Sequence, residues 1–166
     1  MATAIFYASS TGNTEFVAKK IAKECNITDV FDIANKGVSI MQEYETVLIG
    51  ISTWGEGELQ DDWDDVWSEF CDIDFSGKTV AIFGFGDQDS YADTFVDAMG
   101  IVYEQVVQKG ARVIGEWSAV DYDYEESKAE VVEGYFVGLV LDEENQSELT
   151  DERIKIWCKT IKNEII

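Results

Sequence analysis

The sequence TAIFYASSTGNTEFVAKKIAKEC, residues 3–25, decides the fold class of this chain. Residues 3–8 are apolar and rich in residues that favour strands, and a polar cluster follows them at 9–14. Apolar side chains then recur at helical spacing up to Cys25, so we expect a helix over about 14–25. A strand, a polar turn and an amphipathic helix in this order are typical of the first half of a βαβ unit.

The same alternation of apolar runs and helical patterns continues along all 166 residues. Further strands are expected at 27–33, 46–53, 78–84 and 112–115, and further helices around 63–70, over 94–109 and after a cap at Thr150. The strand pattern breaks after Trp117 and resumes at 135–141, so we interpret Ser118 to Gly134 as an insertion into the last strand. The pattern predicts a single α/β domain with a doubly wound, five-stranded parallel sheet.

The net charge of the chain limits the kinds of macromolecule that we expect it to bind. The chain has 12 basic and 34 acidic residues, which give a formal net charge of −22. Such a charge repels nucleic-acid phosphates and anionic lipid surfaces, so we expect neither nucleic acid nor a membrane as a partner. Basic protein faces are favoured instead.

Missing residue types exclude several kinds of catalysis. The sequence contains no histidine, which excludes Ser-His-Asp and Cys-His catalysis and histidine-ligated metals. Cys25, Cys71 and Cys158 are too scattered for an iron–sulfur or zinc motif, and no metal site is expected. They favour buried apolar thiols in a reducing compartment, and residues 1–10 do not resemble a signal peptide. We therefore expect a cytoplasmic location.

The polar loop 9–14 follows the carboxyl end of the first strand, where doubly wound sheets bind ligands. Its hydroxyl groups, its amide and the free N–H groups at the start of a helix together favour an anion. The loop has neither the Gly-Lys-Ser/Thr ending of a P-loop nor any basic residue, which favours a terminal monophosphate over a polyphosphate. An ordinary polar turn with Thr14 as the helix N-cap is the alternative.

The loops after the third and fourth strands each contain one large aromatic residue among glycines. Trp54 lies in TWGEGELQDDW, and Tyr91 ends the segment GFGDQDSY. Neither residue fits a helical or strand period, and exposed aromatics in loops often contact ligands. We expect a slot for a flat conjugated ring between Trp54 and Tyr91. Four glycines would let backbone groups approach the edge of that ring: Gly55, Gly57, Gly84 and Gly86.

These three loops resemble the FMN-binding loops of flavodoxins. The matching segments are SSTGNT, TWGEGELQDDW and FGDQDSYADTF. The segment FVGLVLDEENQSELTDERIKIW, which follows the insertion, is similar to the long-chain subgroup of that family. The resemblance covers the whole chain in order and implies the strand order 2-1-3-4-5.

The resemblance implies a role for each loop position. Residues that would bind the FMN phosphate are Ser9, Ser10, Thr11, Gly12, Asn13 and Thr14. Trp54 and Tyr91 would enclose the isoalloxazine ring, and Asp87 would bind its pyrimidine edge. Backbone groups near the ring would come from Thr53, Gly55, Glu56, Phe85 and Gly86. Thr94 stands where many long-chain members have Asn, so a side-chain amide contact is lost or replaced by a hydroxyl.

The resemblance also implies a low-potential one-electron carrier, not an enzyme, with non-covalently bound FMN that uses the semiquinone/hydroquinone couple. Residues 56–74 include nine acids and no base, and carboxylates near the ring would lower the potential of the anionic reduced form. Because Gly55 lacks a Cβ, the 54–55 peptide can flip and its carbonyl would accept from the flavin N5–H. Expected partners are basic-faced redox proteins, such as a ferredoxin/flavodoxin-NADP reductase and low-potential acceptor enzymes, which would bind the monomer transiently.

Two other classes of protein fit the residues less well. An FMN-dependent NAD(P)H:quinone reductase needs a nicotinamide and quinone pocket beside the flavin, whereas Trp54 and Tyr91 would cover both ring faces. A phosphoacceptor receiver needs acidic residues after its first strand, an Asp after the third and a Lys after the fifth. This chain has Ser9, Ser10 and Thr53 at the first two of these points.

Overall fold

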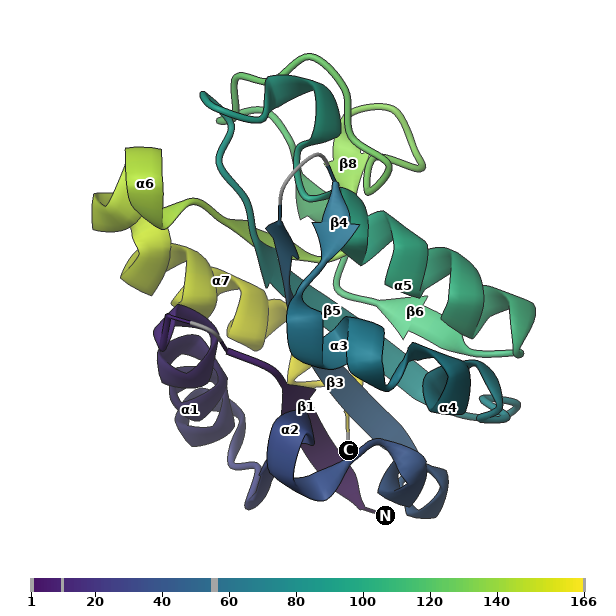
Figure 1. Ribbon diagram of the computed structural model, residues 1–166. Helices are drawn as coiled ribbons and strands as arrows, with labels where there is room; N and C mark the ends of the chain where they lie inside the picture. Colours follow the sequence, from purple (N-terminus) through teal and green to yellow (C-terminus); the bar gives the residue numbers. More distant parts are fainter. Residues whose placement is uncertain (1, 10, 55–56, 166) are drawn as a thin grey trace.

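The computed structural model describes residues 2–9, 11–54 and 57–165. Strands and helices alternate as predicted (Figure 1). The strands are β1 (Thr3–Tyr7), β2 (Asp29–Asp32), β3 (Thr46–Trp54), β4 (Glu58–Leu59), β5 (Thr79–Phe85), β6 (Arg112–Ile114), β7 (Trp117–Ser118), β8 (Tyr135–Phe136) and β9 (Leu139–Leu141). The α-helices are α1 (Asn13–Cys25), α2 (Ile33–Lys36), α3 (Asp61–Asp65), α4 (Trp67–Cys71), α5 (Asp97–Gln108), α6 (Glu143–Gln146) and α7 (Thr150–Ile161). Short 3-10 helices cover Ser39–Glu43, Ala92–Thr94 and Ser147–Leu149.

A parallel sheet in the order β2-β1-β3-β5-β6 forms the centre of the molecule (Figure 1). β6 pairs with residues 79–81 of β5, and β9 pairs in parallel with residues 83–85 of the same strand. Together β6 and β9 therefore form one fifth strand that the insertion interrupts. The predicted fold class, strand order and interruption are confirmed.

The insertion leaves the sheet after β6 and returns to it at β9. Its base is the antiparallel pair β7–β8. The return passes through Gly138, where a Cβ would lie 1.8 Å from the carbonyl oxygen of Ile82. The predicted strand at 135–141 is for this reason two short strands, separated by a point where only glycine fits against β5.

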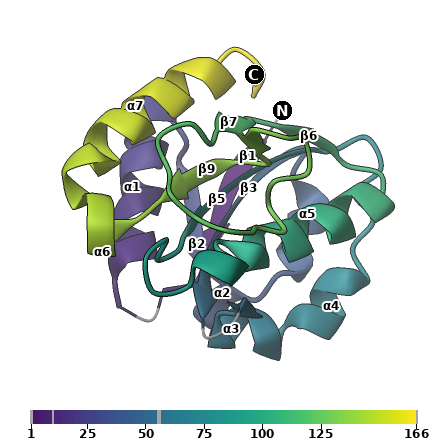
Figure 2. The same ribbon diagram turned by 90° about the horizontal axis from the view of Figure 1, so that it is seen from above.

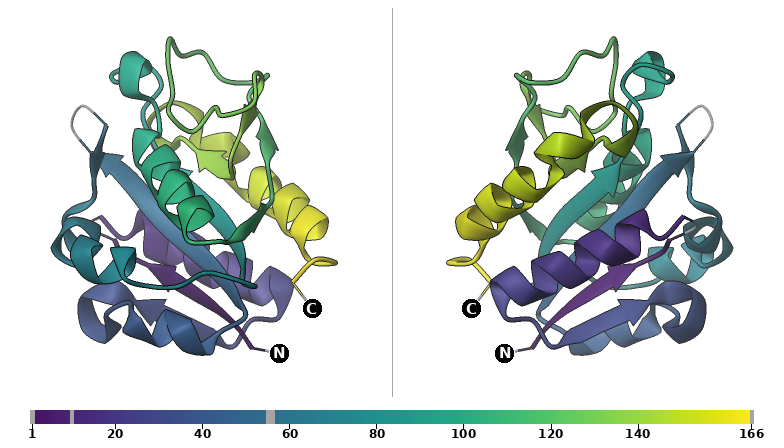
Figure 3. Two further views of the ribbon diagram at one scale, coloured as in Figure 1. Left: turned by 90° about the vertical axis from the view of Figure 1, so that its right-hand side faces the viewer. Right: turned by 90° about the vertical axis from the view of Figure 1, so that its left-hand side faces the viewer.

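Helices cover both faces of the sheet. α1 and α7 lie on one face, and α3, α4 and α5 lie on the other (Figures 2 and 3). Successive residues of β1 point to opposite faces, so Ala4 and Phe6 join one core cluster while Ile5 and Tyr7 join the other. Burial on both faces explains why the central strands are apolar almost throughout.

Two helices begin within one residue of the predicted positions, but their capping residues differ from the expected ones. α1 begins at Asn13 with Gly12 as its N-cap, so Thr14 is inside the helix. Thr150 does not cap α7 either: the N-cap is Leu149, and the Thr150 hydroxyl donates to Glu143 Oε1 at 2.6 Å. The chain before Thr150 is already helical, so α7 needs no separate start signal there.

Other predicted boundaries change because of contacts with distant residues. The helix expected over 94–109 begins at Asp97, and Thr94 lies in a 3-10 turn. The Ala98 N–H donates to Thr53 Oγ1 at 3.1 Å, so a residue of β3 supports the start of α5. The helix expected around 63–70 is divided into α3 and α4 at Val66. The second strand is shorter than the predicted 27–33 because Ile33 begins α2.

Among the helices of the described residues, none is both long and apolar enough to cross a lipid bilayer.

Candidate functional site

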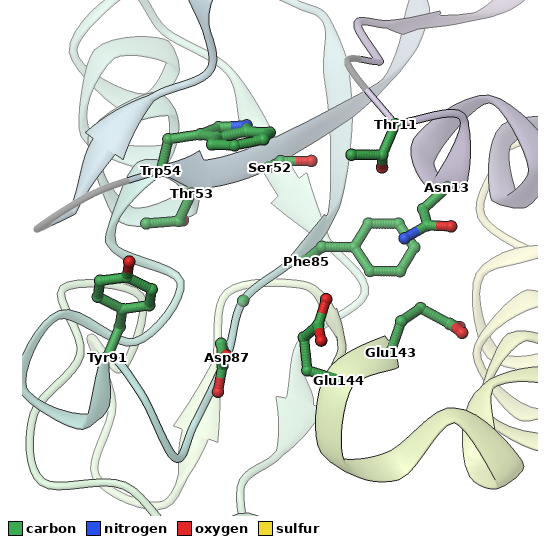
Figure 4. A pocket seen from close by; sticks show the side chains of 11 residues that line it. Thr11, Asn13, Ser52, Thr53, Trp54, Phe85, Asp87, Tyr91, Glu143 and Glu144 are labelled. Atoms are coloured by element: carbon green, nitrogen blue, oxygen red, sulfur yellow. The ribbon is translucent and has the colours of Figure 1, made fainter.

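A single hollow lies at the carboxyl ends of the central strands and brings the three predicted loops together (Figure 4). Its lining residues are Thr11, Asn13, Ser52, Thr53, Trp54, Phe85, Gly86, Asp87, Tyr91, Glu143 and Glu144. The hollow has a volume of about 210 Å³ and opens to solvent. The strand order reverses between β1 and β3, which is where doubly wound sheets bind ligands.

Not every predicted site residue lines this hollow. Ser9 and Gly12 in the first loop and Thr14 in the first turn of α1 do not line it. Thr94 lines another hollow, together with acidic residues of the insertion. Predictions for Ser10, Gly55 and Glu56 fall outside the described residues. Sequence reasoning missed Ser52, Glu143 and Glu144, although the segment around the latter two was noticed as similar to the long-chain subgroup.

The amino end of α1 offers backbone donors to an anion. Gly12 precedes the helix with a φ of 91°, a conformation that favours glycine, and among the described residues no side chain caps this helix. The first backbone hydrogen bond of the helix runs from the Phe16 N–H to the Gly12 carbonyl at 3.0 Å. The backbone N–H groups that come before Phe16 in the helix therefore have no acceptor within it. Ser9 Oγ accepts from the Gly12 N–H at 2.8 Å and closes the turn. The residues therefore fit a phosphate held by neutral donors.

Thr14 fixes the position of this helix end. Its side chain is buried, and its Oγ1 lies 3.0 Å from Ser52 Oγ on β3. Thr14 therefore connects α1 to the central sheet and is not the N-cap that the alternative interpretation of the loop required. Ser52 in turn lines the hollow, so the two hydroxyls place the helix N-terminus relative to the end of β3.

The other end of the hollow carries the two loop aromatics. Trp54 projects from the end of β3 and Tyr91 from the loop after β5, across the hollow from Thr11 and Asn13 (Figure 4). Their exposed fractions are 44% and 45%, although both are large and apolar. Exposed aromatic surface beside a cavity is typical of a contact site for a flat ligand.

Asp87 shapes the loop that carries Tyr91. Its Oδ1 accepts from the N–H groups of Asp89 (3.1 Å) and Ser90 (2.9 Å) and from the Asn145 side chain (2.9 Å). Partial burial opposes ionisation, but the hydrogen bonds from Ser90, Asn145 and Asp89 outweigh it and lower the pKa of Asp87. A bond from Asp87 to the pyrimidine edge of a flavin stays a prediction.

Gly84 near the end of β5 and Gly86 in the loop after it both serve protein packing. A Cβ at Gly86 would lie 2.7 Å from Val96 Cγ1, and a Cβ at Gly84 would lie 2.5 Å from the Ile51 carbonyl oxygen. The space at Gly84 is thus filled by β3 and by Met99 of α5, and the space at Gly86 by Phe95 and Val96, which precede α5. Gly86 lines the hollow with its backbone.

A buried carboxylate, Asp142, connects the Tyr91 loop to α6, and sequence reasoning missed it. Asp142 is 0% exposed. Its Oδ2 accepts from the N–H (3.0 Å) and Nε2 (2.7 Å) of Gln88, and its Oδ1 accepts from the Asn145 N–H at 3.1 Å. The Asp123 N–H donates to Gln88 Oε1 at 2.7 Å, which joins the insertion to the same network. The network holds the Tyr91 loop in place.

The charges around the hollow are almost all negative. Glu143 and Glu144 project from the start of α6 into it (Figure 4). The ion pairs found in the described part of the chain are Lys19–Glu15, Lys20–Asp151 and Arg112–Glu164, and they include none of the acids of residues 57–74. Within residues 2–9, 11–54 and 57–165, no group of His, Cys, Asp and Glu is arranged to hold a metal ion.

A doubly wound sheet with an anion-binding helix end and exposed aromatics around one hollow defines a class of α/β domains that bind phosphorylated cofactors with flat rings. The Flavodoxin family model matches residues 5–157. The chain is 47% identical over 162 residues to the flavodoxin of Nostoc sp. (strain PCC 7120 / SAG 25.82 / UTEX 2576), which covers 96% of this chain and 95% of that protein. It is 44% identical over 165 residues to Flavodoxin 1 of Escherichia coli (strain K12), with 98% and 94% covered.

Solved structures show the same similarity. The crystal structure of Fusobacterium nucleatum flavodoxin bound to flavin mononucleotide has a TM-score of 0.89 to this chain at 34% identity, with 99% of both chains covered. This chain belongs to the flavodoxin family.

Proposed function

We propose that this chain is a low-potential one-electron carrier that binds FMN non-covalently in the hollow at the ends of β1, β3 and β5. One observation carries the proposal: the uncapped N-terminus of α1 and the exposed rings of Trp54 and Tyr91 belong to the same hollow. When bound, FMN supplies redox chemistry in steps of one electron. The crystal structure of F. nucleatum flavodoxin bound to flavin mononucleotide supports the same cofactor here.

Different residues of the hollow bind different parts of the cofactor. The first turn of α1 and loop 9–14 hold the phosphate, because N–H groups and the positive end of the helix dipole point toward it. Trp54 and Tyr91 contact the ring faces and exclude water from them. The roles predicted for Ser10, Gly55 and Glu56 are part of the same proposal and rest on the family resemblance.

Negative charge beside the ring lowers the reduction potential. Glu143 and Glu144 line the hollow, and a carboxylate disfavours any added negative charge on a neighbouring group. Because both side chains reach solvent, screening reduces the effect of each. Among the described residues that line the hollow there is no Lys or Arg, so this repulsion is not compensated there.

The same charges favour a basic partner. Residues 57–74 expose a run of carboxylates on α3 and α4, close in sequence to Trp54. We infer that basic-faced proteins, such as a ferredoxin/flavodoxin-NADP reductase and low-potential acceptor enzymes, dock transiently on a monomer. The insertion between β7 and β8 supports assignment to the long-chain subgroup, and the three unbridged cysteines support a cytoplasmic location.

An FMN-dependent NAD(P)H:quinone reductase is not favoured. The chain has no histidine, and two aromatic rings at the cofactor would leave little room for a nicotinamide. Purified protein that oxidises NAD(P)H with a quinone but without a reductase would support that activity.

The test of the proposal is an absorption spectrum recorded during stepwise reduction. We expect a purified protein with the bands of oxidised flavin, one FMN per chain after extraction, and two separate one-electron steps. Apoprotein that takes up no FMN, or protein that is reduced only in one two-electron step, would contradict the proposal.

A further inference from the structure

An apolar groove lies between α5 and the insertion. Two hollows of about 560 and 100 Å³ share Tyr103 of α5 and Val131 of the insertion, so they form one continuous feature, which we call the α5 groove. None of the described residues that line it also lines the hollow proposed to bind FMN. Six apolar side chains define the α5 groove: Ile101, Tyr103 and Val107 of α5, Val131 and Val132 of the insertion, and Tyr135 of β8.

Four of these side chains are exposed to solvent. Val131 and Val132 are 54% and 58% exposed, and Val107 and Tyr135 are 43% and 45% exposed. Single apolar residues scattered over a surface are common, but these four line two adjoining hollows. Contiguous apolar surface of this kind is typical of a site where another protein binds.

Hydrogen bonds fix the shape of the groove on the side of the insertion. The Tyr135 N–H donates to the Val132 carbonyl at 2.9 Å and closes a tight turn. The Gly134 N–H in this turn donates to Glu130 Oε2 at 2.9 Å, and the Gly134 carbonyl accepts from the Ala119 N–H at 2.9 Å. A partner that contacts the exposed valines would therefore not have to order a loose loop, which reduces the entropic cost of binding.

The other side of the groove is α5, which packs closely against the insertion (Figure 1). A Cβ at Gly100 would lie 2.4 Å from the carbonyl carbon and oxygen of Lys128, so a side chain there would prevent this approach. The close approach brings Val131 to the same hollow as Val107. Gly100 also lines that hollow and is buried. The bottom of the groove is thus tightly packed, while its valines stay exposed.

The charged residues at the groove are mainly acidic. Glu104 and Glu116 line it, and Glu133 follows Val132 in the exposed turn. Lys128 is the one basic residue among the described residues that line the two hollows. These charges favour a partner that carries Lys or Arg beside its apolar side chains. A second copy of this chain would bring the same carboxylates and a further net charge of −22, which opposes its binding.

We propose that the α5 groove binds an amphipathic helix of a partner protein. Aliphatic side chains of that helix fill the two hollows, and its Lys or Arg side chains lie beside Glu104, Glu116 and Glu133. The partner leaves the hollow at the ends of β1, β3 and β5 open, because the two sites share none of the described lining residues. The chain thus has a docking surface separate from the acidic residues that follow Trp54.

The probe for this surface is a synthetic helical peptide, LKKLLKLLKKLLKL, labelled with a red dye. It is titrated into the FMN-loaded protein and followed by fluorescence anisotropy in about 0.15 M salt, where charges further apart than about 8 Å are screened. We expect the peptide to bind the unmodified chain and to bind Val107→Ser and Val131→Ser at least about fivefold more weakly. Ile156→Ser is the matched control, because it shortens an aliphatic side chain of α7 that is 50% exposed outside the groove, and it should keep the affinity.

Backbone amide chemical shifts of the same protein locate the bound peptide. We expect shifts at 101–107 and 131–135 and none at 86–91, with an unchanged flavin spectrum. No binding, or equal binding to Val107→Ser, Val131→Ser and the unmodified chain, overturns the proposal, because the peptide then recognises at most the net negative charge. Shifts confined to α3 and α4 overturn it as well. So does a dimer in sedimentation equilibrium that Val131→Ser dissociates, because a second copy of the chain is then the occupant.

Discussion

Replacement of Asp142 by alanine should weaken both the fold and FMN binding. Asp142 is fully buried, and its oxygens accept from Gln88 and Asn145. Alanine removes this acceptor while Gln88, which is 6% exposed, stays in place. The backbone N–H and the Nε2 of Gln88 are then left without their partner inside the protein.

The size of the loss follows from the number of donors left unpaired. Each buried unpaired donor costs about 1–3 kcal/mol, so the two donors of Gln88 predict a loss of roughly 2–6 kcal/mol in the free energy of unfolding. Asp142→Asn keeps one oxygen for Gln88 but turns an NH₂ toward the N–H of Asn145. It should lose about half as much as Asp142→Ala.

The assay is urea unfolding of the apoprotein, followed by circular dichroism, together with titration of FMN by quenching of its fluorescence. The FMN dissociation constant of Asp142→Ala should rise at least about tenfold, or about 1.4 kcal/mol, because the network holds the loop that carries Tyr91. Asp121→Asn removes an exposed acid nearby and should change neither quantity. A stability of Asp142→Ala within about 1 kcal/mol of the unmodified chain, or an unchanged affinity, would refute the role given to this network.

Three other predictions concern the site and its surroundings. Trp54→Ala and Tyr91→Ala should each raise the FMN dissociation constant about 10- to 100-fold in the same fluorescence titration, because each loses a ring stack. Tyr135 is an exposed tyrosine of β8, and the control Tyr135→Ala should leave the dissociation constant unchanged. Glu144→Gln should raise the lower midpoint potential of bound FMN by a few tens of millivolts in a potentiometric titration, with the difference shrinking as salt is added; an unchanged potential would remove Glu144 from the electrostatic account. Burial raises the pKa of Tyr122 to about 12. The unfolded chain loses this proton from about pH 10, while the folded chain keeps it up to about pH 12. Between these pH values the free energy of unfolding should fall by about 1.4 kcal/mol per pH unit. Urea midpoints of Tyr122→Phe should lack this part of the decline, and parallel pH profiles for both proteins would contradict it.

Local patterns predicted the sheet and most of the site. Residues that are close along the chain are buried together, and this leaves a pattern in the sequence. The apolar run over 46–53 is one such pattern, and the helical spacing of the apolar residues before Cys25 is another. Trp54 and Tyr91 were recognisable because no strand or helix period accounts for them. The structure places both at the hollow that the first loop also reaches.

Helix ends were harder to predict because their supports come from elsewhere in the chain. The start of α5 depends on Thr53 Oγ1 and not on a cap at Thr94. Thr14, which resembles an N-cap in sequence, instead meets Ser52 of β3. Such pairings leave no local pattern in the sequence, so only the folded chain shows which donor bonds to which acceptor.

Adjacent positions along the chain were enough to specify the fold class and the three loops of the site, because the alternation of strands and helices and the residues of a loop are local properties. How β6 and β9 share the edge of β5, and how Asp142 holds the Tyr91 loop, could be seen only in the folded chain. Each of these depends on residues far apart along the chain, which meet only after the sheet has formed and the helices have packed on it.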